Sequence, residues 1–151
     1  MLRSLVGSEM CIRDSSKVAN YRSGGHPEFE DFGDATLLAD NGATFYFRVD
    51  WFTPGGLGAW GDGRTFVLGT DGYIEIRKYL DVARDPEGDH VYIVDGAGER
   101  HEHVHGRVGF PFFGDLILDC LERTERAMPQ RHAFLAMELA LEAQERAVRI
   151  A

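Results

Sequence analysis

The chain of 151 residues is poor in cysteine, in basic residues and in long apolar runs, and each shortage argues against a class of protein. Its two cysteines, Cys11 and Cys120, lie far apart, which argues against a disulfide scaffold and fits a reducing, cytoplasmic compartment. Asp and Glu number 25 against 16 Lys and Arg, and the charge of −9 disfavours binding to nucleic acid or an anionic membrane. No apolar run approaches the roughly 20 residues of a membrane span.

The composition is otherwise that of a folded protein, with 44% hydrophobic and 27% charged residues. Residues 1–15 stand apart because they show neither helical nor strand periodicity, and Leu5-Val6 is too short for the apolar region of a signal peptide. The segment resembles the translated adapter tract that heads many reading frames from environmental sequencing; the alternative is a native arm. We expect a non-native or disordered leader over 1–15 and one domain over 16–151, cut from a longer protein.

Three hairpins are predicted after the leader, because turn residues separate runs of strand character. The turns are Asn41-Gly42, Asp71-Gly72 and Gly96-Ala97-Gly98. The flanking strand-like runs are 34–40 and 43–52, 64–70 and 73–79, and 90–94 and 99–104.

The pattern becomes helical after residue 111. Residues 112–127 carry an apolar helical stripe that includes Cys120, Pro129 interrupts it, and residues 131–150 are rich in good helix formers. Strands followed by helices predict an α+β fold: an open-faced, mainly antiparallel sheet with two C-terminal helices packed on one face.

Residues 56–61, Gly-Leu-Gly-Ala-Trp-Gly, match the G-x-G-x-x-G pattern of dinucleotide-binding folds. That chemistry needs a helix directly after the motif, whereas a strand is predicted at 64–70. We therefore interpret the motif as a glycine-rich turn and predict no cofactor-binding residue in this chain.

Three histidines, His101, His103 and His105, alternate along a predicted strand and so share one face. The outer two would lie about 13 Å apart, so one metal ion cannot take all three, and no further ligand is evident in the sequence. We predict no metal site. The alternative hypothesis is a free-standing ligand-binding, metal-binding or dimerisation module that uses this strand.

No nucleophile–histidine–acid arrangement and no G-x-S-x-G motif occur, so no catalytic residue is predicted. Asp115 and Asp119 are interpreted as part of a solvated helix face, and Cys120 as a small core residue.

Polar and aromatic residues near the glycine-rich loop suggest a substrate site. Tryptophan rings stack on polyols, and an aspartate and an arginine add charge-assisted hydrogen bonds, while residues at the start of a helix attract anions. The predicted substrate-binding residues are Trp51, Trp60, Asp62, Arg64 and His132. The alternative is that the loop residues pack over one end of the sheet and that His132 belongs to a polar helix start without a ligand.

In the run 43–52, Ala43, Phe45, Phe47, Val49 and Trp51 form the expected core face. The opposite face mixes tyrosines with charges, and such a mixture is typical of an interface. The predicted interface residues of a homo-oligomer are Tyr46, Arg48, Tyr73 and Arg77.

Several runs resemble the C-terminal domain of the Gfo/Idh/MocA oxidoreductases. They are Glu-Asp-Phe-Gly-Asp-Ala-Thr-Leu at 30–37, Asn-Gly-Ala-Thr at 41–44, Gly-Thr-Asp-Gly-Tyr-Ile-Glu-Ile at 69–76, and the helix at 136–147. The resemblance implies an NAD- or NADP-dependent parent enzyme that acts on a sugar, cyclitol or related polyol and pairs subunits through its open sheet face.

The family's Rossmann domain, its Glu-Lys-Pro segment and its Gly-Gly-Gly…Asp-x-x-x-His segment are absent from this sequence. No position here therefore inherits a catalytic role. The chain is expected to bind no cofactor alone and to contribute a wall of the substrate pocket and a subunit interface.

Overall fold

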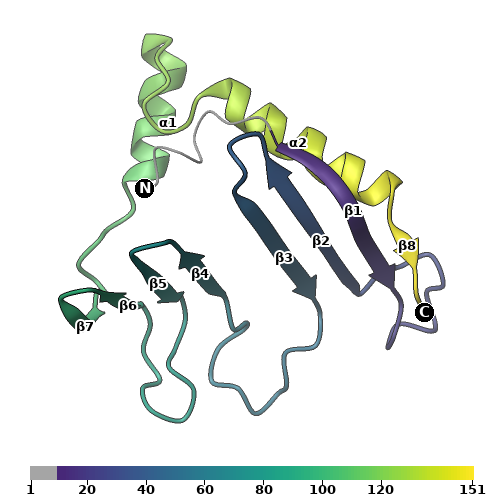
Figure 1. The fold of residues 1–151 in the computed structure, drawn as a ribbon, viewed down its shortest axis with the longest axis horizontal. Coiled ribbons are helices and arrows are strands. Elements are labelled where there is room, and N and C mark those ends of the chain that lie inside the picture. Colours follow the sequence, from purple (N-terminus) through teal and green to yellow (C-terminus); the bar gives the residue numbers. More distant parts are fainter. Residues whose placement is uncertain (1–9) are drawn as a thin grey trace. The chain divides into compact units, whose positions relative to one another are not determined.

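The computed structural model describes residues 10–151, which form eight strands and two helices (Figure 1). They divide into two compact units, one of residues up to Phe52 plus Pro111–Ala151 and the other of Thr53–Phe110. The predicted α+β class is confirmed, and the strands are distributed over two four-stranded sheets. No helix of the described residues is long and apolar enough to cross a bilayer.

The sheet of the first unit has the strand order β3-β2-β1-β8. Its strands are β1 (Met10–Ala19), β2 (Phe32–Ala39), β3 (Thr44–Asp50) and β8 (Val148–Arg149). β1, β2 and β3 pair antiparallel, while β8 pairs parallel with β1. The predicted hairpin between β2 and β3 is confirmed, and Gly42 in its turn has a φ of 82°, which glycine adopts at little cost.

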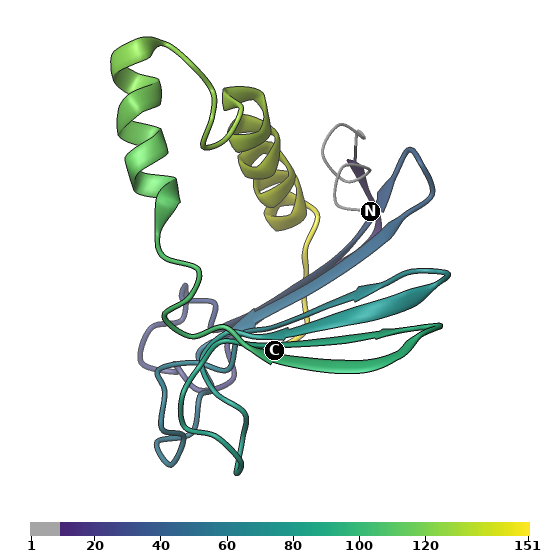
Figure 2. The same cartoon turned by 90° about the vertical axis from the view of Figure 1, so that its left-hand side faces the viewer.

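Helix α2 (Gln130–Glu145) covers one face of this sheet (Figure 2). Leu139 and Ala143 of the helix form the core with Ala35 and Leu37 of β2, because alternate residues of a strand share a face. Phe47 of β3 packs against the same cluster, as predicted for the core face of this strand. Phe45, Val49 and Trp51 of that predicted face are instead 46–65% exposed, so α2 covers only part of it.

The helices are shorter than predicted. α2 ends at Glu145 instead of residue 150, and the next residues form β8, which pairs with Lys17 and Val18. α1 (Pro111–Glu122) ends five residues before the predicted boundary at 127.

Asp119 explains the early end of α1. Its carboxylate accepts hydrogen bonds from the backbone N–H groups of Arg126 and Ala127 and from the hydroxyl of Thr124, at 2.7–2.9 Å. These bonds draw the chain back across the helix end. The interpretation of Asp119 as part of a solvated face was wrong, since it is buried, and so was that of Cys120 as a core residue, since it is exposed.

β1 extends into the predicted leader. Met10, Cys11 and Ile12 pair with β2, and the register then shifts between Ile12 and Ser16, where regular pairing resumes. The irregularity coincides with the predicted boundary after residue 15. Residues 1–9 lie outside the described residues, and the non-native origin of the leader stays a prediction.

The second unit is an antiparallel sheet of the order β4-β5-β6-β7. Its strands are β4 (Arg64–Leu68), β5 (Gly72–Arg77), β6 (His90–Asp95) and β7 (Gly98–His103). The two predicted hairpins at Asp71-Gly72 and residues 96–98 are confirmed. The glycine-rich segment 56–61 leads into strand β4 and not into a helix.

Replacement of Asp119 by asparagine is expected to lower the melting temperature at neutral pH. Hydrogen bonds from the Arg126 amide and the Thr124 hydroxyl lower the pKa of this carboxyl in the folded chain. Ionised Asp119 therefore stabilises the fold above its ordinary pKa of about 3.9, and this contribution is lost as the pH falls through the lower folded value. Thermal melts should show a difference in melting temperature between Asp119→Asn and the unaltered chain, and this difference should become smaller below about pH 4. A difference that does not depend on pH would contradict this explanation.

Candidate functional site

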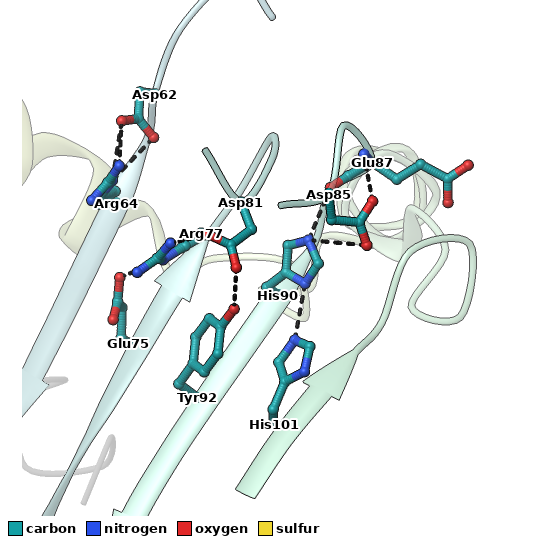
Figure 3. Close-up of polar contacts among 10 residues, drawn as sticks. All are labelled: Asp62, Arg64, Glu75, Arg77, Asp81, Asp85, Glu87, His90, Tyr92 and His101. Atoms are coloured by element: carbon teal, nitrogen blue, oxygen red, sulfur yellow. Dashed lines mark hydrogen bonds and ion pairs between the residues drawn. The ribbon is translucent and has the colours of Figure 1, made fainter. Parts of the chain in front are cut away.

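One face of the second sheet carries most of its polar side chains. The strand register aligns Arg64, Arg77, His90 and His103 in one row across the four strands. The adjacent row on the same face holds Phe66, Glu75, Tyr92 and His101. We call this surface the polar face; Figure 3 shows most of its members and their contacts.

Arg77 is the centre of the first cluster on the polar face. Its Nε donates to Glu75 Oε1 at 2.7 Å, and its Nη1 donates to Asp81 Oδ1. The guanidinium lies over the ring of Tyr92, 5.2 Å from the ring centroid. The Tyr92 hydroxyl donates to Asp81 Oδ2 at 2.7 Å, so Asp81 joins arginine and tyrosine.

The hydrogen bonds of this cluster determine the protonation states of Asp81 and Tyr92. The Tyr92 hydroxyl and the Arg77 charge lower the pKa of Asp81. Burial and the hydrogen bond to Asp81 raise the pKa of Tyr92. At neutral pH Asp81 is therefore an anion and Tyr92 a protonated donor. A general acid or base works best with a pKa near the working pH, so these shifts disfavour an acid–base role for either residue.

Histidines form the second cluster. His90 is fully buried, and its Nε2 lies 2.9 Å from the Glu87 carbonyl while its Nδ1 lies 2.9 Å from His101 Nε2. Because a carbonyl only accepts, His90 Nε2–H donates to Glu87, and Nδ1 accepts from His101. His103 Nε2 donates to the Gly88 carbonyl, and its ring stacks on His90 at 4.7 Å between centroids.

The turn from Asp81 to Asp85 joins the two clusters. Two backbone hydrogen bonds between these residues close it, at 3.0 and 2.9 Å. One end supplies the Asp81 carboxylate to Arg77 and Tyr92, and the other places Asp85 Oδ2 3.8 Å from His90 Nε2. The turn therefore positions a carboxylate in each cluster.

The predicted substrate-binding residues fall in both units. Asp62 and Arg64 form an ion pair at 2.8 Å in the second unit, and Trp60 in the same unit is 82% exposed. Trp51 belongs to the first unit, where its ring lies 6.4 Å from that of Phe29. His132, also in the first unit, lies in the first turn of α2.

The predicted interface residues differ in exposure. Tyr46 is 59% exposed and its hydroxyl lies 3.4 Å from Asp34 Oδ2, while Tyr73 is 40% exposed. Arg48 pairs with Asp50 at 2.8 Å. Arg77 is more enclosed than the others and is held by Glu75 and Asp81.

Sequence reasoning overlooked Asp81, Asp85, His90 and Tyr92. The two aspartates lie in a turn without periodicity, so the sequence does not predict where their side chains point. His90 and Tyr92 alternate on a strand that the hairpin at 96–98 joins to the histidine strand. That alternation was the one available signal, because facing strands of a hairpin pair their side chains.

Comparison with known proteins finds relatives among solved structures. A protein from Erwinia carotovora atroseptica SCRI1043, described as a "putative oxidoreductase", is 56% identical, with a TM-score of 0.89 over 95% of this chain. A protein of the same description from Thermotoga maritima is 19% identical, with a TM-score of 0.73, and shows the shared fold alone. This chain spans 42% and 40% of their lengths. No family model and no curated protein matches it.

Proposed function

We propose that this chain is the C-terminal domain of an NAD- or NADP-dependent oxidoreductase of the Gfo/Idh/MocA type that acts on a sugar, cyclitol or related polyol. In this proposal the domain supplies a wall of the substrate pocket and a subunit interface. The observation that carries the proposal is the 56% identity, over 95% of the chain, to the larger Erwinia protein described as a "putative oxidoreductase".

Helix α1 provides independent support for a missing partner domain. It is apolar on most of its surface, yet Phe113, Ile117 and Leu121 are between 61% and 75% exposed. Contiguous apolar surface of this kind marks a site that another surface covers. In the proposal, part of the parent enzyme that lies outside this chain covers α1.

The nicotinamide cofactor does not fit the residues described here. The glycine-rich segment 56–61 is followed by β4, so it lacks the helix N-terminus on which a pyrophosphate rests. We therefore assign cofactor binding and hydride chemistry to the rest of the parent enzyme.

The polar face fits a role in holding a substrate. Arg64 and Glu75 of this face, with Asp62 beside Arg64, present charges that ion pairs hold in place. Charged side chains that are held by neighbours bind polyol hydroxyls without first being ordered. The exposed Trp60 supplies a ring on which a sugar could stack.

A chimera tests the proposed function. Residues 16–151 would replace the matching segment of the Erwinia protein, and NAD- and NADP-dependent oxidation would be assayed on a panel of sugars and cyclitols. We expect the chimera to oxidise the substrates of the unaltered Erwinia protein, and Arg64→Gln to raise KM more than it lowers kcat. A folded chimera that is inactive where the Erwinia protein is active would refute the proposal.

The subunit interface has its own test. We expect the chain to be a homodimer or larger at tens of micromolar, and Tyr46→Glu with Tyr73→Glu to dissociate it, because two carboxylates would lose hydration on burial. Light scattering measures the mass of each. A monomer in both samples would contradict the predicted interface.

A further inference from the structure

We propose that Asp85, His90 and His103 form a binding site for a divalent metal ion of the zinc type. The inference is independent of the proposed function, because it rests only on the second unit. The three residues each offer one ligand atom, and these atoms all lie within 4.8 Å of one another. Of the three, only His103 was considered as a metal ligand from the sequence.

The fold brings the three ligands together from separate segments. His90 begins β6 and His103 ends β7, and the register pairs them directly. Their rings are nearly parallel, at 11°, and both Nε2 atoms face the loop of residues 85–88, where they contact the carbonyls of Glu87 and Gly88. Asp85 enters from the turn that it closes with Asp81.

The donor set has the chemistry of a zinc site that keeps an open position. Two imidazoles and one carboxylate bind Zn²⁺ at about 2.0–2.2 Å and leave a fourth place for water or a ligand. Bonds of that length put ligand atoms about 3.3 Å apart. Asp85 Oδ2 and His90 Nε2 lie 3.8 Å apart. To bind an ion, both histidine rings would have to turn away from the Glu87 and Gly88 carbonyls that their Nε2 atoms now contact.

The surroundings supply an outer contact for one of the two histidine ligands, His90. A histidine that binds a metal through Nε2 donates its Nδ1–H to an acceptor, which fixes the ring. His90 Nδ1 lies 2.9 Å from His101 Nε2, and the Tyr92 ring stacks on His101 at 4.5 Å. On metal binding the protons of His90, His101 and His103 would each move from Nε2 to Nδ1, with no net change in charge on any ring, and the Glu87 and Gly88 carbonyls would lose the hydrogen bonds that they accept now.

This site differs from the three-histidine metal site on one strand that the sequence analysis rejected. The histidines of β7 were not expected to hold a metal because no further ligand converged on them. Asp85 and His90 are such ligands for His103, while His101 serves as an outer contact. His105 is outside the group of three converging ligand atoms, and its Nδ1 lies 3.8 Å from Asp89 instead.

Zinc titration of the full chain tests the proposal. The protein would be stripped with a chelator and titrated with Zn²⁺ by calorimetry, and the cobalt form would be examined by absorption spectroscopy. We expect one ion per chain and cobalt bands of a tetrahedral site. His101→Gln should weaken binding by about 10–100-fold, the range for lost outer contacts.

Variants separate this site from adventitious binding. Asp85→Asn and His103→Gln should each abolish the stoichiometric binding, whereas His105→Gln, the matched control beside His103, should leave it unchanged. Circular dichroism would verify that each variant is folded. Absence of saturable binding to the unaltered chain, or full binding in both Asp85→Asn and His103→Gln, would overturn the proposal and leave the histidines as a hydrogen-bonded turn support.

Discussion

Leu139→Ala is expected to lower the free energy of unfolding by about 2–5 kcal/mol, the usual cost of a buried leucine truncated to alanine. Leu139 is 7% exposed and is one of the two buried leucines, with Leu37, of the small core that α2 forms with β2. Its neighbours Ala35 and Ala143 are too short to fill the space that it would leave. Because the core has few members, truncation of one of them should lower the stability of the whole first unit. Urea denaturation followed by circular dichroism measures the change.

Leu141→Ala is the matched control on the same helix. Leu141 is 61% exposed, so its truncation removes little buried surface and should change stability by less than about 0.5 kcal/mol. Equal losses for the two variants would mean that α2 does not dock through the face that carries Leu139.

Gly72→Ala is expected to cost about 3 kcal/mol, the upper end for an overpacked site. A Cβ atom built on Gly72 would lie 2.2 Å from the Val94 carbonyl oxygen and 3.1 Å from Asp95 Cα. These are backbone atoms of the neighbouring strand β6, so no side-chain rotation can relieve the clash. Strands β5 and β6 would have to move apart at this point, and the residues of the polar face on these two strands would no longer lie side by side.

Gly96→Ala is the control for this effect, because nothing lies within 4 Å of the Cβ position at Gly96. Thermal melts of the two variants should show a large decrease for Gly72→Ala and a small change for Gly96→Ala. A tolerated Gly72→Ala would show that the approach of the two strands is looser than described.

The hairpins were predictable because their turns are specified locally. Asn41-Gly42 and Asp71-Gly72 favour tight turns whatever the remainder of the chain does, and each lies where the pattern placed it. The α+β class followed from the order of these hairpins and the helical stripes. The division into two sheets did not, since strand patterns do not reveal which hairpins pair with one another.

The errors arose where a long-range contact overrides a local preference. Residues 146–150 favour a helix by composition, but Val148 and Arg149 gain a strand partner in β1. The helical pattern continues past Glu122, yet the Asp119 carboxylate captures the amides that follow. The candidate site could not be predicted for the same reason. Its row of polar residues forms only when the registers of three strand pairs are known; the row consists of Arg64, Arg77, His90 and His103.

The second unit interrupts the first, and this has a consequence for the order of folding during synthesis. In the second unit, Thr53–Phe110, each strand pairs only with strands next to it in the sequence. This unit can therefore fold as soon as it is synthesised, because short loops cost little entropy. The first unit must wait for α2 and for β8, whose Val148 pairs with Lys17 near the other end of the chain. Contacts so distant in sequence form slowly. Until they form, the apolar face of β2 remains uncovered, so a nascent chain that has emerged from the ribosome only as far as residue 129 should hold a folded second unit and a first sheet without its covering helix.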